Sequence, residues 1–341
     1  MIHRGSIRIL PALLVAIAFH ASAPDNLLTA HAVKADGAAG AAVSPCPPDC
    51  DEPTWTRVTL PRFVHALTMT TEGISNNRTV AGWALRDEDL PDLPFFWSAS
   101  TGLQASPLPD VAHGGRVFGM SLNGRWAVGY GKLASGRPIP LRWNLTDGPS
   151  VRRLPVCQGT NGWGRAVNND GIVVGQINGV GAAYWPDPAS CATVLTFVDP
   201  SAEATGINNA GDIVGSVTRG TLGFIFHYQS PTFSHFLTGG SPTAINNAGT
   251  AIGFRQHDGD HTATIGTWPS GSVEMTPVAT STPLAFDPAI SNKDRLVWES
   301  VTDLHGAVDA LPDVPTGVNN CGDISLWTGG VAALFLKTTC D

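Results

Sequence analysis

The chain has 341 residues, of which 43% are hydrophobic and 14% are charged, and its formal net charge is −8 at pH 7. This hydrophobic content excludes an intrinsically disordered chain, which would carry few apolar residues and many charges. Only 20 Lys and Arg residues are present, too few to supply the clustered cations that contact nucleic-acid phosphates. We therefore expect no nucleic-acid partner. The 38 Gly and 26 Pro residues follow no triplet period, and they indicate many turns between short strands.

The N-terminal residues have the features of a secretory signal peptide. A basic start precedes an apolar run over residues 9–19 and the small-x-small site Ala30-His31-Ala32. The apolar run is too short to span a membrane, although an uncleaved anchor is the alternative. We expect residues 1–32 to be the signal peptide and residues 33–53 to be an Ala-, Gly- and Pro-rich linker. The mature protein would then be secreted, extracellular or periplasmic, with no transmembrane segment after signal removal.

Six cysteines fit an oxidising compartment. Their spacing lacks the two close Cys pairs, or the following His pair, of a zinc site, so we expect no metal. Sequence alone leaves the disulfide connectivity open. We favour the pairs that close moderate loops, with the third pair assigned by elimination: Cys157 with Cys191, Cys321 with Cys340, and Cys46 with Cys50.

A hairpin motif recurs seven times, about every 41 residues. In each copy a small residue and an aliphatic anchor precede a polar pair rich in Asn, and most copies continue through Gly into alternating aliphatic residues. Asn and Gly tolerate positive φ, so each centre is expected to form a tight turn between antiparallel strands. The copies are residues 73–82, 119–129, 166–175, 206–215, 244–253, 289–294 and 317–324.

Further strand-like segments lie between these hairpins. They are residues 95–97, 141–143, 183–185, 224–226 and 265–268, and a second set at 151–156, 193–198 and 232–237. Each repeat of about 40 residues thus supplies about four short strands, which is the content of one propeller blade. One blade cannot bury its own faces, so all repeats should join in one domain. We expect an all-β fold over residues 54–341, a single β-propeller of seven blades, closed by pairing residues 56–60 with 331–336.

These repeats resemble the extracellular HAF-repeat family, whose repeats combine a His-Ala-Phe strand with an Ile-Asn-Asn-x-Gly hairpin. The resemblance covers residues 55–336 and rests on the five strongest hairpins. The His-Ala-Phe triplet is degenerate here, surviving partly as His261-Thr262-Ala263 and as Ala333-Leu334-Phe335, and the last two hairpins end on Trp298 and Leu326 instead of Gly. The resemblance implies propeller-like blades and secretion, and it implies no particular activity.

Metal and catalytic motifs are weak in this sequence. The Asn-rich turns offer too few carboxylates for calcium, which prefers six to eight oxygen ligands, so we interpret them as structural. The cluster His257-Asp258-Gly259-Asp260-His261 gathers metal-capable side chains, but Asp258-Gly259 is itself a turn signal. The acidic segment 86–92 is interpreted as a solvated loop. No Gly-x-Ser-x-Gly, His-Glu-x-x-His or phosphate-loop motif is present, so we expect no cofactor.

One tryptophan stands apart from the repeat. Trp97, Trp143, Trp185 and Trp268 recur at one strand position and indicate packing between blades. Trp163 instead lies in the Gly-flanked segment 158–164, which we interpret as a loop feeding a hairpin. A ring in such a loop either packs between blades or contacts a sugar or peptide. Trp163 is therefore the one candidate ligand-binding residue.

For function, the sequence favours a secreted binding or interaction module for an extracellular glycan or protein, without enzymatic activity. The alternative is an extracellular polymer-degrading hydrolase or lyase, because propellers host such enzymes at the mouth of the central channel. Asp187, Glu203, His227 and Tyr228 could serve it, but nothing in the sequence brings them together, so no catalytic residue is assigned. Titratable groups converging at one mouth would favour an enzyme; aromatic and amide groups without a coupled base would favour binding.

Overall fold

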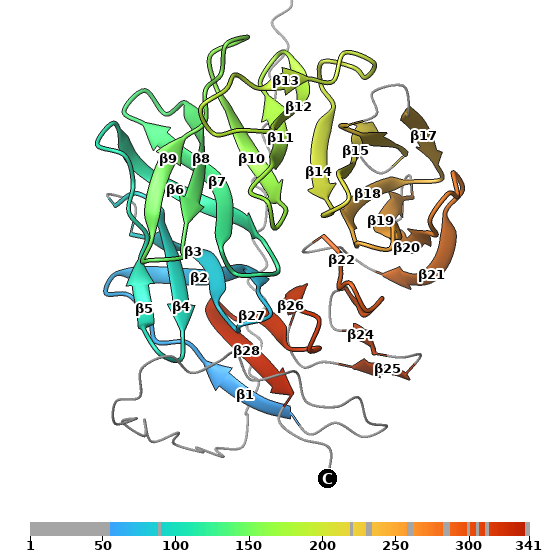
Figure 1. Ribbon diagram of the computed structural model, residues 1–341. Coiled ribbons are helices and arrows are strands. Elements are labelled where there is room, and N and C mark those ends of the chain that lie inside the picture. The colour runs from blue at the N-terminus through green and yellow to red at the C-terminus, as the bar shows by residue number, and fades with distance from the viewer. Residues whose placement is uncertain are drawn as a thin grey trace, which may run out of the picture. The chain divides into compact units, whose positions relative to one another are not determined.

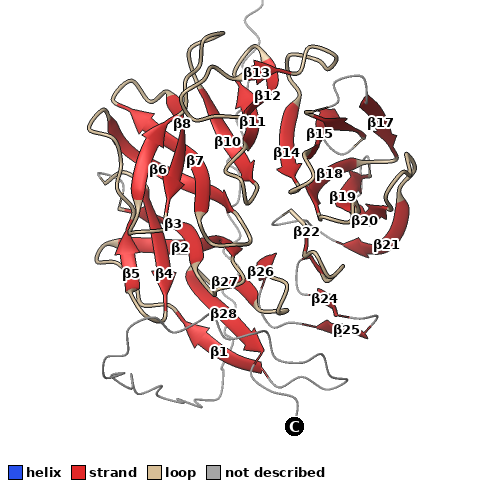
Figure 2. Ribbon diagram, in the orientation of Figure 1, coloured by secondary structure: helices blue, strands red, loops and turns tan. Residues whose placement is uncertain are grey.

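The repeats form β-sheets with their strands in chain order. The computed structural model describes residues 55–87, 90–218, 221–229, 234–257, 262–281, 287–298, 301–304, 307–310 and 314–337. In these residues the chain forms seven antiparallel four-stranded sheets, with strands and connecting loops and no helix (Figures 1 and 2). Each sheet is one blade of a single β-propeller, and each hairpin copy of the sequence forms the first two strands of one blade.

Blades 1 to 4 take their strands consecutively from the chain. Blade 1 contains β2 (Ala66–Ile74), β3 (Val80–Arg86), β4 (Leu93–Ser98) and β5 (Gly102–Ala105). Blade 2 contains β6 (Ala112–Met120), β7 (Trp126–Leu133), β8 (Pro138–Asn144) and β9 (Ser150–Arg153). Blade 3 contains β10 (Gly162–Val167), β11 (Val173–Ile177), β12 (Gly181–Trp185) and β13 (Thr193–Val194). Blade 4 contains β14 (Glu203–Ile207), β15 (Asp212–Thr218), β16 (Leu222–His227) and β17 (Ser234–Thr238).

Blades 5 and 6 repeat this order, and blade 7 combines both ends of the repeat region. Blade 5 contains β18 (Ser241–Ile245), β19 (Ala251–Gln256), β20 (Ala263–Trp268) and β21 (Thr276–Ser281). Blade 6 contains β22 (Ala289–Ile290), β23 (Leu296–Trp298), β24 (Val301–Leu304) and β25 (Ala307–Ala310). Blade 7 contains β26 (Val314–Val318), β27 (Ile324–Thr328), β28 (Val331–Lys337) and β1 (Trp55–Thr59).

The ring is closed by the first and last strands. β1 pairs antiparallel with β28, in a register that runs from Trp55 opposite Lys337 to Thr59 opposite Ala333. β2 of blade 1 also contacts β27 of blade 7, so every blade contacts the next around the circle. The predicted pairing of the two strands is confirmed. It removes two sheet edges that an open array would expose.

The Asn-rich segments are tight turns, as predicted. The fourth residue after each anchor adopts positive φ, for example Gly171 at 83° and Gly249 at 83°. Blades 1 and 6 carry Arg78 and Asp294 at this position, with φ values of 60° and 56°. The missing glycines of these two copies therefore leave the turn conformation unchanged, at the steric cost that a side chain pays there.

These turns also bond to one another, which the sequence did not reveal. Asn320 N donates to Asn76 Oδ1 at 3.0 Å, so the last repeat contacts the first. One such bond joins each turn to the next, forming a closed circle of seven hydrogen bonds that we call the Asn ring. The other six run from Asn76 N to Leu122 O, Asn123 N to Asn169 Oδ1, Asn169 N to Asn209 Oδ1, Asn209 N to Asn247 Oδ1, Asn247 N to Asn292 Oδ1 and Asn292 N to Asn320 Oδ1.

The core lies between neighbouring blades. Trp143 of blade 2 shares a buried cluster with Phe96 of blade 1, and Trp268 of blade 5 shares one with Val214 of blade 4. Trp97 of blade 1 likewise shares a cluster with Leu334 of blade 7, and Trp185 of blade 3 shares one with Val128 of blade 2. The prediction that these four tryptophans pack between blades is confirmed.

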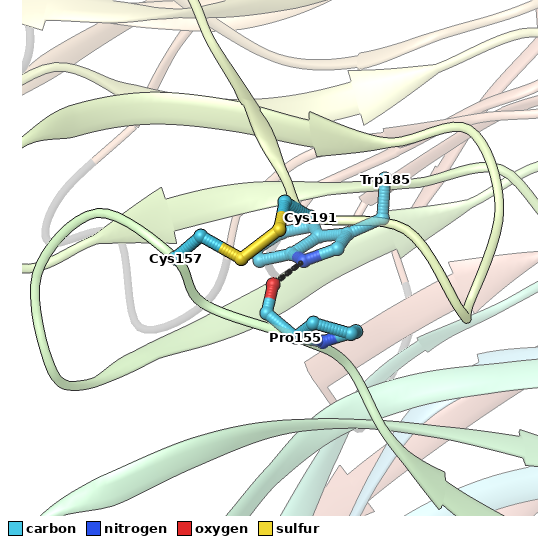
Figure 3. Close-up of a disulfide and its surroundings, with 4 residues drawn as sticks. All are labelled: Pro155, Cys157, Trp185 and Cys191. Carbon is cyan, nitrogen blue, oxygen red and sulfur yellow. Dashed lines mark hydrogen bonds between the residues drawn. A yellow bond between two sulfur atoms is a disulfide. The ribbon is translucent and has the colours of Figure 1, made fainter.

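One predicted disulfide lies within the described residues. Cys157 and Cys191 are bonded, and they join the segment before β10 to the loop between β12 and β13, beside the indole of Trp185 (Figure 3). The Trp185 Nε1 donates to Pro155 O at 2.8 Å. Cys321 is also disulfide-bonded. The predicted signal peptide, the linker, Cys46, Cys50, Cys340 and residues 258–261 of the His257 cluster lie outside the described residues.

The predicted loop around Trp163 is wrong. Residues 162–167 form β10, and Trp163 pairs with Gln176 of β11. The flanking glycines allow close packing. A Cβ on Gly162 would lie 2.3 Å from Gln176 O, and a Cβ on Gly164 would lie 2.2 Å from Val128 Cγ2.

Candidate functional site

The inner strands share one irregularity next to each hairpin anchor. In β2, β6, β10, β14, β18 and β26 the pairing register shifts by one residue just before the anchor. A bulge of this kind turns an extra side chain out of the regular sheet. The extra residues are Glu72, Phe118, Arg165, Thr205, Thr243 and Thr316, and Pro288 holds the equivalent position before β22.

All seven of these residues line one cavity of about 640 Å³. Its walls come from the inner strand of every blade, so it lies on the axis of the propeller, and we call it the axial cavity. Four Asn-ring residues, Asn169, Asn209, Asn247 and Asn292, also contribute to its wall. The volume falls within the roughly 300–1,000 Å³ of typical ligand pockets.

A small residue follows each bulged residue and brings the inner strands close together. The seven are Gly73, Gly119, Ala166, Gly206, Ala244, Ala289 and Gly317. A Cβ on Gly119 would lie 2.7 Å from Arg165 O, and one on Gly317 would lie 3.2 Å from the Cα of Gly73. The sequence signal for the cavity wall is thus a triplet: a residue that varies between blades, then a small residue, then the aliphatic anchor.

Arg165 is the cationic residue of the axial cavity. Its Nε lies 3.1 Å from Glu203 Oε1, and its Nη2 lies 3.4 Å from Asp287 Oδ2. Its guanidinium carbon also lies 5.0 Å from the ring centre of Phe118. Trp163 approaches the same carboxylate, because its Nε1 donates to Glu203 Oε1 at 2.6 Å.

Glu72 lies on the wall in a different environment. Its Oε1 accepts a hydrogen bond of 2.7 Å from Trp83 Nε1. Burial raises the pKa of the Glu72 carboxyl to about 7, and the charge of Asp287 acts in the same direction. The Trp83 hydrogen bond and the positive charge of Arg165 oppose this rise. Glu72 therefore exchanges its proton near neutral pH, unlike an ordinary exposed carboxyl.

The predicted site residues are distributed unevenly. Glu203 lies beside the axial cavity, in an adjoining hollow that shares Arg165 and Asp287 with it. Asp187, His227 and Tyr228 are not among the described lining residues. His227 Nδ1 instead lies 2.9 Å from Asp212 Oδ1, and Asp187 Oδ1 accepts from Ala189 N. Sequence reasoning missed Glu72, Arg165 and Asp287.

The remaining candidates offer little chemistry. His257 Nε2 hydrogen-bonds Thr264 Oγ1 at 2.7 Å. In the part of the chain that the structure describes, no group of three or more His, Cys, Asp or Glu side chains could hold a metal ion. Within that same part, no helix is long and apolar enough to cross a membrane.

Comparison with solved structures defines the class of protein as a β-propeller. YCF48 bound to D1 peptide superimposes with a TM-score of 0.54 at 12% identity, over 86% of this chain and 100% of that chain. The Cps50 (Swd1) propeller domain of Myceliophteria thermophila gives 0.53 at 11% identity, over 83% and 100%. Virginiamycin B lyase from Staphylococcus aureus gives 0.51 at 11% identity, over 84% and 99%. These identities support the fold alone. No protein-family model matches the chain, and no curated protein does.

Proposed function

We propose that this chain is a secreted seven-bladed β-propeller of the HAF-repeat type, which binds an extracellular glycan or protein through the axial cavity. One observation supports this most strongly: the seven residues at the position before the small residue of each blade, six of them bulged, differ in type and line the same cavity, while the turns and cores that build the scaffold stay alike. A repeated scaffold whose lining residues differ from blade to blade suits a recognition site.

The bonding of the lining residues favours binding over catalysis. Two of the bulged threonines donate to main-chain carbonyls, from Thr205 Oγ1 to Pro242 O at 2.9 Å and from Thr243 Oγ1 to Pro288 O at 2.7 Å. Neither hydroxyl is bonded to a base that would activate it as a nucleophile. Arg165 is held by two carboxylates, and Glu72 is bonded to an indole.

A hydrolase or lyase is the second candidate, and Glu72 is the observation that favours it. A carboxyl whose pKa is raised to about 7 can act as a general acid or base at neutral pH. The propellers with similar folds do not decide between the two roles. One is bound to a peptide and another is named as a lyase, and a fold does not determine a function.

Secretion is proposed from the N-terminal sequence and is compatible with the Cys157–Cys191 disulfide. The purified extracellular protein should begin downstream of Ala23, at Val33. Intact-mass measurement before and after alkylation tests both points. Two or more alkylated cysteines in the unreduced protein would contradict full disulfide bonding.

The binding proposal is tested with panels of polysaccharides and peptides, scoring bound ligand and released product separately. Arg165→Ala should change the affinity for the ligand found by about tenfold or more, because it leaves Glu203 and Asp287 unpaired in the site. A ligand that contacts Arg165 directly should bind more weakly, and a cationic ligand should bind more tightly. Arg153→Ala is the matched control, since Arg153 is exposed on the outer strand β9. Equal binding by the wild type, Arg165→Ala and Arg153→Ala would mean that the ligand binds outside the axial cavity. Release of a product would favour an enzymatic function.

A further inference from the structure

The axial cavity and its adjoining hollow contain more carboxylates than cations. Glu72, Glu203 and Asp287 are lining residues, and Arg165 supplies the guanidinium among the described lining residues. Arg116 also acts on Glu72, but it is paired with Asp92 at 2.6 Å. Arg165 already contacts Glu203 and Asp287, at 3.1 and 3.4 Å. When the three carboxylates and the Arg165 guanidinium are all ionised, their summed charge is negative.

Glu72 forms no ion pair with a Lys or Arg side chain among the residues that the structure describes. Its described hydrogen bond comes from the neutral indole of Trp83. A positive group placed beside Glu72 would compensate the cost of its burial. A negative ligand would instead compete with Glu203 and Asp287 for Arg165 and add another buried anion. Electrostatics therefore favours a cationic ligand group over an anionic one.

Part of the lining can contact an aliphatic chain, and the asparagines of the Asn ring add amide groups to the wall. Phe118 and Phe254 line the cavity together with Ile, Val, Ala and Gly residues of the inner strands. Thr205 and Thr243 donate their hydroxyl hydrogens to main-chain carbonyls, so they have no hydrogen left to donate to sugar hydroxyls. An apolar stem ending in a compact positive charge is the structure of a lysine side chain.

We propose that the axial cavity receives a lysine side chain from a peptide segment of a partner protein, with its ammonium group beside Glu72. This inference rests on the proposed binding function and names its ligand class. Phe118 contributes an aromatic ring to the cavity wall, and such a ring attracts cations. The guanidinium carbon of Arg165 already lies 5.0 Å from its centre.

The test follows the indole N–H signals of Trp83 and Trp163 by NMR, because these groups are bonded to Glu72 and Glu203. The probe is the blocked peptide acetyl-Gly-Gly-Lys-Gly-Gly-amide, compared with the same peptide carrying acetyl-lysine or Glu. We expect the lysine peptide to shift the Trp83 signal in a saturable way. The acetyl-lysine peptide should bind about tenfold more weakly or worse, since it keeps the stem and loses the charge.

Protein variants give the second arm of the test. Glu72→Gln keeps an oxygen for the Trp83 hydrogen bond but removes the charge, so lysine-peptide affinity should fall about tenfold, whereas Glu72→Asp should retain part of it. Glu274→Gln, at an exposed site, should bind like the wild type. Melting curves show whether each variant is folded, and the acetyl-lysine comparison tests the charge in wild-type protein alone.

The possible results separate this inference from the proposed function. Equal binding of lysine and acetyl-lysine peptides, or no shift of the Trp83 signal with any lysine peptide, overturns the inference. A glucosamine trimer that binds through Glu72 while the lysine peptide does not would replace the peptide with an amino sugar. In each of these cases the binding function stands if the panel ligand still depends on Arg165. It fails if that ligand binds Arg165→Ala normally.

Discussion

Arg165 and Asp287 meet across the axial cavity, with Nη2 of the arginine 3.4 Å from Oδ2 of the aspartate. Arg165 belongs to β10 of blade 3, whereas Asp287 precedes β22 of blade 6. Two blades separate them around the ring. The contact between their side chains therefore links two blades that are not neighbours. The Arg165 side chain must reach across the cavity to make it.

Trp163 supports this arginine through their shared partner, Glu203. Trp163 is not among the described residues that line the axial cavity or its adjoining hollow. Trp163→Ala should therefore change ligand affinity by only about 1 kcal/mol, through loss of its hydrogen bond to Glu203. It should cost only about 1–2 kcal/mol of unfolding free energy, because Trp163 is half-buried and belongs to none of the buried clusters. Trp143→Ala is the control and should cost roughly 3–5 kcal/mol, because Trp143 is fully buried. Denaturation and affinity measured on the same samples check both effects. A stability loss as large as that of Trp143→Ala, with unchanged affinity of the folded protein, would remove Trp163 from the site.

Where the residue after the anchor is Asn, its side chain should stabilise the fold through two kinds of hydrogen bond, one within its own turn and one to the next turn. Asn208 Oδ1 accepts from Asp212 N at 2.9 Å within its own turn, and Asn208 Nδ2 donates to Asn246 O at 3.0 Å in the next. Asn208→Ser should lose both bonds of Nδ2, to Asn246 O and to Asp212 Oδ2. It should keep the bond from Asp212 N, since Ser121 accepts from Trp126 N in the same way. We expect a cost of about 1 kcal/mol for serine and about 2–3 kcal/mol for alanine. Urea denaturation measures both. No loss of stability in the serine variant would show that the bonds of Asn208 Nδ2 contribute nothing, and equal losses in the two variants would show the same for the bond from Asp212 N.

Glu72 should make stability depend on pH. Its pKa is raised to about 7 in the folded protein from an ordinary value of 4.5, so the folded state binds more protons between these values. Its stabilising contribution is complete below about pH 4.5 and is lost as the pH rises through about 7. The charged groups that act on it are Asp287, Arg165 and Arg116.

Glu72→Gln should remove this dependence. The difference in unfolding free energy between wild type and variant should change by on the order of 1–3 kcal/mol from about pH 5 to about pH 8, with the wild type losing stability relative to the variant. Denaturation at a series of pH values measures it. A flat difference would mean that Glu72 titrates as an exposed carboxyl.

Closure by the chain ends should be required for cooperative folding. Deletion from Gly330 onward removes β28, which pairs with both β1 and β27. Both remaining strands would lose a hydrogen-bonded neighbour, and blade 7 would expose its edges. We expect the single melting transition to be lost in calorimetry. Unchanged melting of the truncated protein would mean that the propeller is stable without the pairing of β28 with β1 and β27.

The sequence predicted the scaffold better than the site. Turn chemistry and alternating aliphatic residues repeat in every copy, so the hairpins and the blade content were evident. The bulged residues differ in type, as with Glu72, Phe118 and Arg165, and only their place before a small residue is shared. Asp287 lies 122 residues from Arg165, so its contact depends on closure of the ring. The glycines that flank Trp163 predict a loop, because glycine is common in turns. In the structure they are instead sites of close packing in β10.

The most direct test of the account is to fill the axial cavity. Thr316→Cys, modified with a bulky maleimide, places a large group among the bulged residues. Thr276→Cys on the exposed outer strand β21 is the matched control. Binding of the panel ligand to each modified, folded protein is then measured. The account predicts that modification at position 316 abolishes binding while modification at 276 leaves it unchanged. Full binding with the cavity filled would contradict it.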